Sequence, residues 1–346
     1  MKFNVDEKYI IDTFRELVNT PSPVGYGVKI NPVLEKIAGE LGERVTYDRR
    51  GTAYITLEGE DNSKTVMLSS HWDTIGMVVR TVDGNGMIRV RQLGGMNYNS
   101  AEGETVTVHT RDGKVYTGII TCQSHSVHVF DNARTLERND DTMIVILDED
   151  IHSKADVRAL GIRNGDYIAL EPRCEYTNNG YLKSRFIDDK AAVACVFAMV
   201  KYMKDNGLKP KYRTMLAFTY GEEIGLGGPY VPEEVSEYVA IDIGLIGPDY
   251  DGHERCVSIC AKDARVTYTY ELVNRLIGYA EKAECDYAVD VFYRYGTDAA
   301  VALGASNNLQ AAAFGMPVYC SHGRERTHML SLVNTTNLLL AYAMDI

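Results

Sequence analysis

Three apolar runs of the sequence end in residues that can bind a metal ion. "TVMLSSHWD" ends in His71 and Asp73, "MLAFTYGEE" ends in Glu222 and Glu223, and "YVAIDIG" contains Asp242. Each run has the composition of a buried strand, and the carboxyl ends of strands in an open parallel sheet line the ligand crevice. Imidazole and carboxylate groups are the usual ligands for zinc and related ions. The pattern therefore predicts a metal site at one edge of a sheet.

Two further segments add candidate ligands. "SRFIDDKAA" places Asp188 and Asp189 in the first turn of a predicted helix, where free N–H groups and the helix dipole favour carboxylates. "SHGRERTHMLS" places His328 in the loop before the last predicted helix. Ligands drawn from several separate segments are typical of a binuclear centre in which one carboxylate bridges two ions. His322 shares its loop with His328, and we keep it as a reserve ligand.

Each of these residues also has an ordinary structural role. An aspartate at a strand end is often a turn residue, and an Asp pair at a helix start is often a cap. His125 and His128 lie three apart in "SHSVHV", which we predict to be a strand, so they would point to opposite faces and chelate poorly. The ordered combination of segments, rather than any single residue, carries the metal-site prediction.

Helical and strand periods alternate along most of the chain. Helices are predicted over residues 5–19, 31–41 and 188–206, with a last helix in "NTTNLLLAYAM". Between about residues 82 and 172 the sequence consists of short segments in which apolar and polar residues alternate, separated by Asp-Gly and Asn-Gly-Asp turns. We therefore predict an α/β fold, with a mixed, mostly parallel sheet flanked by helices built from residues 1–81 and 173–346. A small β-barrel-like domain at 82–172 would be inserted into it.

Composition limits the possible partners and compartment. The 346-residue chain has a formal net charge of -12 and a sequence pI near 5.2, which argues against binding to nucleic acid or an anionic membrane. No run approaches the roughly 18 apolar residues of a membrane span, and the first residues lack the apolar core of a signal peptide. Seven cysteines without a CxxC pair are typical of reduced thiols, so we expect a cytoplasmic protein.

The order of these motifs resembles the M42 family of metallo-aminopeptidases, the glutamyl aminopeptidase and TET peptidase group. "HWDTIG" resembles the family's HxDEIG, "FIDDKAA" its FDDRAG, "YGEEIGLGG" its QEEVGLRGA and "YGTDAA" its GGTDA. "THMLSLVNTTNL" resembles IHSPxExVDLxDV but lacks the proline and glutamate after His328, and Thr74 replaces the glutamate of the first motif.

The resemblance implies the co-catalytic metallopeptidase fold and two divalent metal ions per subunit, with zinc as the first choice and cobalt or manganese as alternatives. It also implies roles for the candidate residues. His71 and Asp242 would be terminal ligands, and Asp188 would bridge the two ions. Glu223 and His328 would complete the ligand set. Glu222 would be the general base, and Asp73 would orient His71.

The same resemblance implies an aminopeptidase that hydrolyses N-terminal residues from peptides. The inserted domain would form dimers, and further assembly into tetrahedral dodecamers stays open. The role of Asp298 in "YGTDAA" also stays open.

Three other functions remain as alternatives. The same metal cage could cleave an N-acyl amino acid or a dipeptide, and the departures from the family motifs keep this reading open. A glycosidase also uses two carboxylates, but it needs them to face each other across a sugar, whereas neighbours on an extended backbone point apart. A non-enzymatic scaffold would have no need of the full set of ligands.

Overall fold

The structure, a computed structural model, describes residues 2–346. Its main feature is an eight-stranded mixed sheet. In spatial order its strands are β1 (Thr46–Tyr47), β2 (Ala53–Leu57), β12 (Tyr212–Thr219), β3 (Asp61–His71), β13 (Val235–Ile241), β17 (Gln310–Gly315), β15 (Val257–Lys262) and β16 (Tyr287–Val291).

The centre of this sheet is parallel. β3 pairs in parallel with β12 on one side and with β13 on the other, and β13 pairs in parallel with β17. Residues 65–71 of β3 are all buried, as expected for a strand covered on both faces. Thr219 lies opposite His71 in the register of β12 and β3, so these strands end side by side. The residues that follow their carboxyl ends therefore meet at one edge.

Six of the helices belong to the α/β part of the chain. They are α1 (Glu7–Val18), α2 (Ile30–Glu40), α5 (Ile187–Asp205), α6 (Tyr270–Lys282), α7 (Asp298–Gly304) and α8 (Met329–Met344). α5 is buried along most of its length, where it packs between α1, α8 and the sheet. The predicted helices over 5–19, 31–41 and 188–206 are confirmed as α1, α2 and α5.

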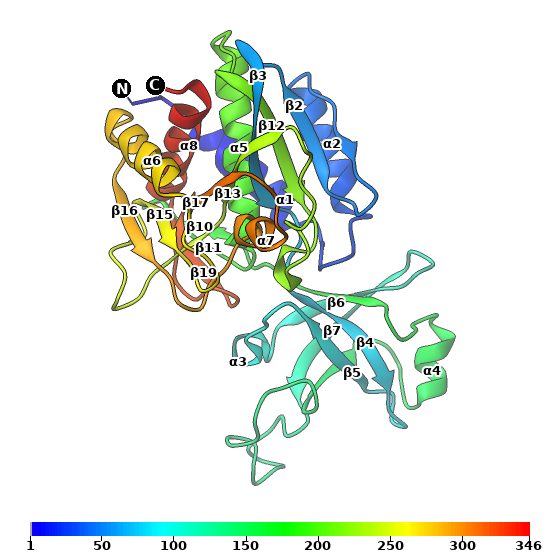
Figure 1. Cartoon of the computed structure of the whole chain (residues 1–346). Coiled ribbons are helices and arrows are strands. Elements are labelled where there is room, and N and C mark those ends of the chain that lie inside the picture. The colour runs from blue at the N-terminus through cyan, green and yellow to red at the C-terminus, as the bar shows by residue number, and fades with distance from the viewer. Residues whose placement is uncertain (1) are drawn as a thin grey trace.

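A closed barrel interrupts the α/β part, and Figure 1 shows it in cyan and green as a separate body below the main sheet. Its strands are β4 (Gly76–Val82), β5 (Ile88–Leu93), β6 (Thr105–His109), β7 (Val115–Cys122), β8 (Met143–Leu147) and β9 (Tyr167–Leu170), with short helices α3 (Tyr98–Ala101) and α4 (Lys154–Ala159) between them. The predicted boundary at residue 82 falls at the end of β4, so the first barrel strand begins earlier than predicted. The predicted mixed sheet with a barrel-like insertion is confirmed.

Short strands complete the fold around the site. β10 (Glu175–Tyr176), β11 (Tyr181–Ser184) and β19 (Glu325–His328) form one small sheet, and β14 (Gly244–Leu245) pairs with β18 (Pro317–Val318). The strand predicted in "SHSVHV" is wrong, because this segment forms turns. All seven cysteines are free, as predicted. Among residues 2–346, no helix is both long and apolar enough to cross a membrane.

Candidate metal centre

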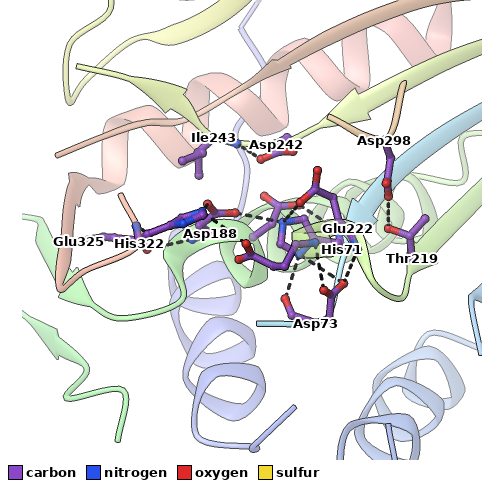
Figure 2. A network of polar contacts seen from close by, with 12 residues as sticks. His71, Asp73, Asp188, Thr219, Glu222, Asp242, Ile243, Asp298, His322 and Glu325 are labelled. Atoms are coloured by element: carbon purple, nitrogen blue, oxygen red, sulfur yellow. Dashed lines mark hydrogen bonds and ion pairs between the residues drawn. The ribbon is translucent and has the colours of Figure 1, made fainter. Parts of the chain in front are cut away.

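The strand ends bring the predicted residues to one edge of the main sheet. His71 is the last residue of β3, Asp242 follows β13 directly, and Glu222 and Glu223 open a single turn of 3-10 helix, η1 (Glu222–Ile224), after β12. Gly221 allows this sharp turn because its φ of 81° lies in the left-handed region. Figure 2 shows His71, Asp188 and Glu222 turned toward one another.

His71 is fixed by a hydrogen bond at each ring nitrogen. Its Nδ1 lies 2.9 Å from the backbone carbonyl oxygen of Asp73, and its Nε2 lies 3.0 Å from Oδ1 of Asp188. Because a carbonyl only accepts, Nδ1 carries the proton, and a neutral ring would present a bare Nε2 to the cluster. Burial opposes the charged ring, but Asp188 and the other nearby carboxylates outweigh it and raise the pKa of His71 well above its usual value.

The carboxylate of Asp73 holds the Glu-Glu turn in place. It accepts hydrogen bonds from the backbone N–H groups of Gly221, Glu222 and Glu223 at 2.8, 3.1 and 3.3 Å. Its Oδ1 lies 3.6 Å from Nδ1 of His71, farther than the Asp73 carbonyl. Asp73 thus orients His71 mainly through its backbone, and its side chain fixes the backbone that carries the two glutamates.

The two glutamates are in an electrostatically costly environment. They lie in a 3-10 turn rather than on the extended backbone we predicted. Burial, together with nearby carboxylates that include Asp242, raises the pKa of both well above the usual range. Burial and the charge of Asp188 also raise the pKa of Asp242 to about 7. Cations bound among these groups would relieve the repulsion.

Asp188 and Asp189 open α5 at a cis peptide bond and point to different partners. Asp188 faces His71, and this hydrogen bond outweighs burial and lowers its pKa. Asp189 accepts a 3.0 Å hydrogen bond from the backbone N–H of His71, and its other oxygen is buried without a hydrogen-bond partner. The sequence places Asp189 beside Asp188 among the candidates, but the family resemblance assigned the ligand role to Asp188 alone.

Two sets of side chains could each hold a metal ion, because the ligand atoms within each set lie within 4.8 Å of one another. The first set is His71, Asp188 and Glu223, and the second is His71, Asp189 and Asp242. Imidazole and carboxylate donors at this density suit divalent ions that accept nitrogen and oxygen ligands. The buried Asp189 oxygen without a partner and the raised carboxylate pKa values fit the same interpretation. The residues present therefore fit a metal centre.

His322, rather than His328, reaches this cluster. Nε2 of His322 lies 3.6 Å from Oδ2 of Asp188 and 3.4 Å from Oε2 of Glu223. Its Nδ1 lies 2.7 Å from the carbonyl oxygen of Gly95 in the barrel insertion, so Nδ1 donates, and a neutral ring would present a bare Nε2 to the carboxylates. This arrangement repeats that of His71, in which a backbone carbonyl fixes the tautomer of a potential ligand.

His328 lies outside the cluster because both of its ring nitrogens have other partners. Nδ1 accepts the backbone N–H of Leu330 at 3.0 Å and caps α8, and Nε2 donates to the carbonyl of Asn179 at 3.0 Å. The ring also packs edge-on against Tyr181. The structure therefore does not support the prediction that His328 is a metal ligand.

Glu325 is a member of the network that the sequence did not point to. It is buried, and its carboxylate accepts the backbone N–H of Asp188 at 3.0 Å and that of His322 at 3.2 Å. Glu325 therefore ties the loop of His322 to the start of α5. Asp298 stands apart in Figure 2, where its carboxylate accepts the Thr219 hydroxyl at 2.6 Å.

The cluster opens into a cavity of about 1000 Å³. The cavity is lined by residues from the second half of the α/β part, 173–346, and by Gly95, Met96 and Asn97 of the barrel insertion. The carboxylates that line it are those of Asp188, Glu222, Glu223 and Asp242. A substrate bound here would contact the proposed ligands directly.

Known proteins share this sequence and architecture. Residues 51–338 match the model of the M42 glutamyl aminopeptidase family. YhfE of Bacillus subtilis (strain 168), which carries a provisional aminopeptidase name, is 37% identical over 336 residues, 97% of each chain. An aminopeptidase of the archaeon Desulfurococcus kamchatkensis superposes with a TM-score of 0.88 at 20% identity, over 98% of this chain and 96% of its own.

A further structural neighbour is the TET1 peptidase of Pyrococcus horikoshii, described as able to assemble into a tetrahedron or a large octahedral shell. Its TM-score is 0.85 at 22% identity, over 97% of this chain and 100% of its own. At these identities the two structures establish the shared fold alone. The fold and the family match define a hydrolase of the aminopeptidase class. The chain belongs to the M42 family, as its motifs indicated.

Proposed function

We propose that this protein is a binuclear-metal aminopeptidase that removes N-terminal residues from peptides. The observation that carries the proposal is the paired orientation of His71 and His322. In each ring a backbone carbonyl holds Nδ1, and Nε2 faces Asp188. Two imidazoles prepared in this way on either side of one carboxylate fit a centre in which that carboxylate bridges two ions.

The contacts support a division of the ligands between two ions. His71 and Asp242 would hold one ion together with the bridging Asp188, which contacts His71, and Asp189 lies in one group with His71 and Asp242, close enough to take part. Asp188, Glu223 and His322 would hold the other. His322 thus replaces His328 in the proposed set. Zinc is the first choice of metal, and cobalt or manganese also accept these donors.

Glu222 is proposed as the general base. Its Oε2 lies 3.8 Å from Nε2 of His71, and the side chain lines the cavity beside the proposed ligands. When bound, the two ions would supply Lewis-acid polarisation of the scissile carbonyl and a water of lowered pKa. Oε2 of Glu222 would accept the proton of the attacking water and return it to the nitrogen of the leaving amine.

The remaining residues would position these groups. Asp73 holds the backbone of Glu222 and Glu223, and Glu325 holds the backbone of Asp188 and His322. Both carboxylates accept two or more backbone N–H groups, so they limit movement of the turns that carry the functional side chains. We propose that they contribute by position and do not contact the substrate.

A substrate panel tests the proposed function. Metal-reconstituted protein should hydrolyse amino acid anilides and leave N-acylated amino acids intact, and chelation should remove the activity until metal is restored. The alternative amidohydrolase function predicts the reverse preference, with cleavage of N-acyl amino acids or dipeptides alone. Hydrolysis that is insensitive to exhaustive chelation would contradict the metal centre.

Assembly and compartment are part of the proposal. The barrel insertion, whose strands run from β4 to β9, would mediate dimers, and the fold shared with the TET1 peptidase supports further assembly into tetrahedral dodecamers. Sedimentation of the purified protein would distinguish a monomer, a dimer and a dodecamer. The acidic chain with free cysteines is in keeping with a cytoplasmic protein.

A further inference from the structure

Two arginines line the same cavity as the metal cluster. Arg265 lies in the loop after β15, and Arg294 lies in the loop after the neighbouring strand β16. Both side chains are exposed to solvent. The cavity therefore contains a cationic region in addition to the carboxylates of the proposed metal ligands.

The guanidinium group of Arg265 lies next to two glycines that also line the cavity. A Cβ built on Gly225 would lie 3.8 Å from its Nη2, and one built on Gly296 would lie 3.7 Å from its Nε. Gly225 comes two residues after Glu223, so the guanidinium group lies close to the turn that carries the two glutamates. The absence of side chains at both glycines leaves the guanidinium group open to a ligand.

Neither arginine has an acidic partner among residues 2–346. The acidic residue nearest to Arg265 along the chain is Asp263. Its carboxylate accepts the backbone N–H groups of Arg265 and Val266, both at 2.8 Å, and the hydroxyl of Tyr268 at 2.9 Å. Its carboxylate is therefore engaged elsewhere. The Arg294 guanidinium lies 5.9 Å from the centroid of the Tyr293 ring. Two guanidinium groups without carboxylate partners in one cavity are available to bind an anion.

The charge balance of the cavity supports an anionic ligand. Its four lining carboxylates, Asp188, Glu222, Glu223 and Asp242, would be neutralised by two divalent ions. The two guanidinium groups would then leave the loaded cavity positive, although the whole chain has a formal net charge of -12. A local positive field in an acidic protein favours a substrate that carries a negative charge.

We infer that the substrate presents a carboxylate to Arg265 and Arg294 while its scissile amide lies at the metal cluster. This inference rests on the proposed function, because it names the class of peptide that the same site accepts. The carboxylate has two possible sources, the acidic side chain of an N-terminal residue or the free C-terminus of a short peptide. A cavity of about 1000 Å³ is large enough for either.

Two pairs of isosteric substrates distinguish the sources. Glutamyl and glutaminyl anilides differ only in the charge of the N-terminal side chain, and Ala-Ala and Ala-Ala-amide differ only in the charge of the C-terminus. We expect Arg265→Ala/Arg294→Ala to lower kcat/KM about tenfold to a hundredfold for the anionic member of one pair, and less than about twofold for its neutral partner. The pair that responds identifies the source.

Arg44→Ala is the matched control, because Arg44 is exposed, lies outside the cavity, and has no ion pair among residues 2–346. It should leave both pairs unchanged. The charge-reversed variant Arg265→Glu should invert the preference within the responding pair. An unchanged ratio of anionic to neutral substrate in both pairs for the double variant would overturn the inference.

Binding measurements separate this inference from the proposed function. L-glutamate and L-glutamine can be titrated calorimetrically into metal-loaded protein, and Ala-Ala and its amide into the metal-loaded Glu222→Gln variant. The double arginine variant should bind the anionic ligand of one pair at least tenfold more weakly. If no anilide or peptide is hydrolysed, the proposed function fails, and equal binding of charged and neutral ligands by wild type and variant overturns the inference independently.

Discussion

The two ends of β13 carry buried carboxylates in opposite electrostatic states. Near its start, Glu237 contacts Lys64 Nζ at 2.5 Å, Arg275 Nη2 at 2.6 Å and the Tyr342 hydroxyl at 2.8 Å. Burial opposes ionisation of Glu237, but these partners outweigh it and lower its pKa. Just past the other end, Asp242 faces further carboxylates, and its pKa is raised to about 7.

This difference separates a structural carboxylate from a functional one. Removal of a buried charge that the chain itself neutralises is destabilising, because it leaves cations without a partner. Buried carboxylates that lack cationic partners in the chain repel one another and lower stability until an external cation binds. Such a cluster therefore indicates a functional site. The same strand thus links a completed ion-pair network to an incomplete one.

The largest expected effect is on catalysis, at the incomplete end. Glu222→Gln removes the proposed base and keeps nearly the same shape, so kcat should fall by roughly 10²–10⁴-fold with both metals retained. The free energy of unfolding should stay the same or rise, because a charge is removed from a repulsive cluster. Anilide hydrolysis, elemental analysis and denaturant unfolding measure these quantities. A fully active Glu222→Gln enzyme would rule out the proposed base.

The same substitution at the completed end should have the reverse consequence. Glu237→Gln leaves Lys64 and Arg275 without their shared anion, so we expect a loss of about 2–3 kcal/mol in the free energy of unfolding. Metal content and kcat of the folded protein should match those of the wild type. Loss of bound metal in this variant would show that the two networks are coupled.

The stability of the metal-free protein should also depend on pH. The folded pKa of Asp242, about 7, lies above its unfolded value near 3.8, so the folded state binds a proton that the unfolded state has released. Its contribution to stability is complete below pH of about 4 and is lost as pH rises toward about 7. Glu237 has the opposite sign, because its lowered pKa makes its contribution disappear on acidification.

The Asp242 effect is isolated by thermal unfolding of chelator-treated wild type and Asp242→Asn between pH 4 and 8. The stability of the wild type relative to the variant should fall across this range, and saturating metal should remove the dependence. A relative stability that rises with pH would mean that burial does not raise the pKa of Asp242.

The smallest expected effect is at His328. His328→Ala removes the cap of α8 and the contact with Tyr181, for which we expect a loss of about 1 kcal/mol in the free energy of unfolding. His328→Asn is the matched control, because asparagine is a good N-cap and should restore part of this loss. Greater destabilisation by His328→Asn than by His328→Ala would exclude capping as the role of this residue.

Strand-end reasoning was sufficient for the part of the site that depends on local sequence. Each apolar run forms a strand, and the polar residue at its end, His71, Glu222 or Asp242, lies at the edge of the sheet. This placement does not depend on contacts with residues far away in sequence. The choice between His322 and His328 depends on a hydrogen bond to Gly95 in the barrel, which lies far away in sequence. The sequence of the loop shows both histidines, but it does not show which of them contacts Gly95.

The fold shows a similar limit. β17 was not predicted, although it lies between β13 and β15 in the sheet. Its sequence, "QAAAFG", is dominated by alanine, which has low intrinsic preference for strands, so its neighbours and not its own composition determine its conformation. The barrel was predictable because its turns carry Asp-Gly and Asn-Gly-Asp signals within the local sequence.

Metal content tests the central claim most directly. Wild type, His322→Ala and His328→Ala would be stripped, reloaded with zinc, freed of excess metal and measured by elemental analysis. The proposed centre predicts two ions per chain for the wild type and for His328→Ala, and a single ion for His322→Ala. Loss of an ion in His328→Ala, with two ions retained in His322→Ala, would contradict it.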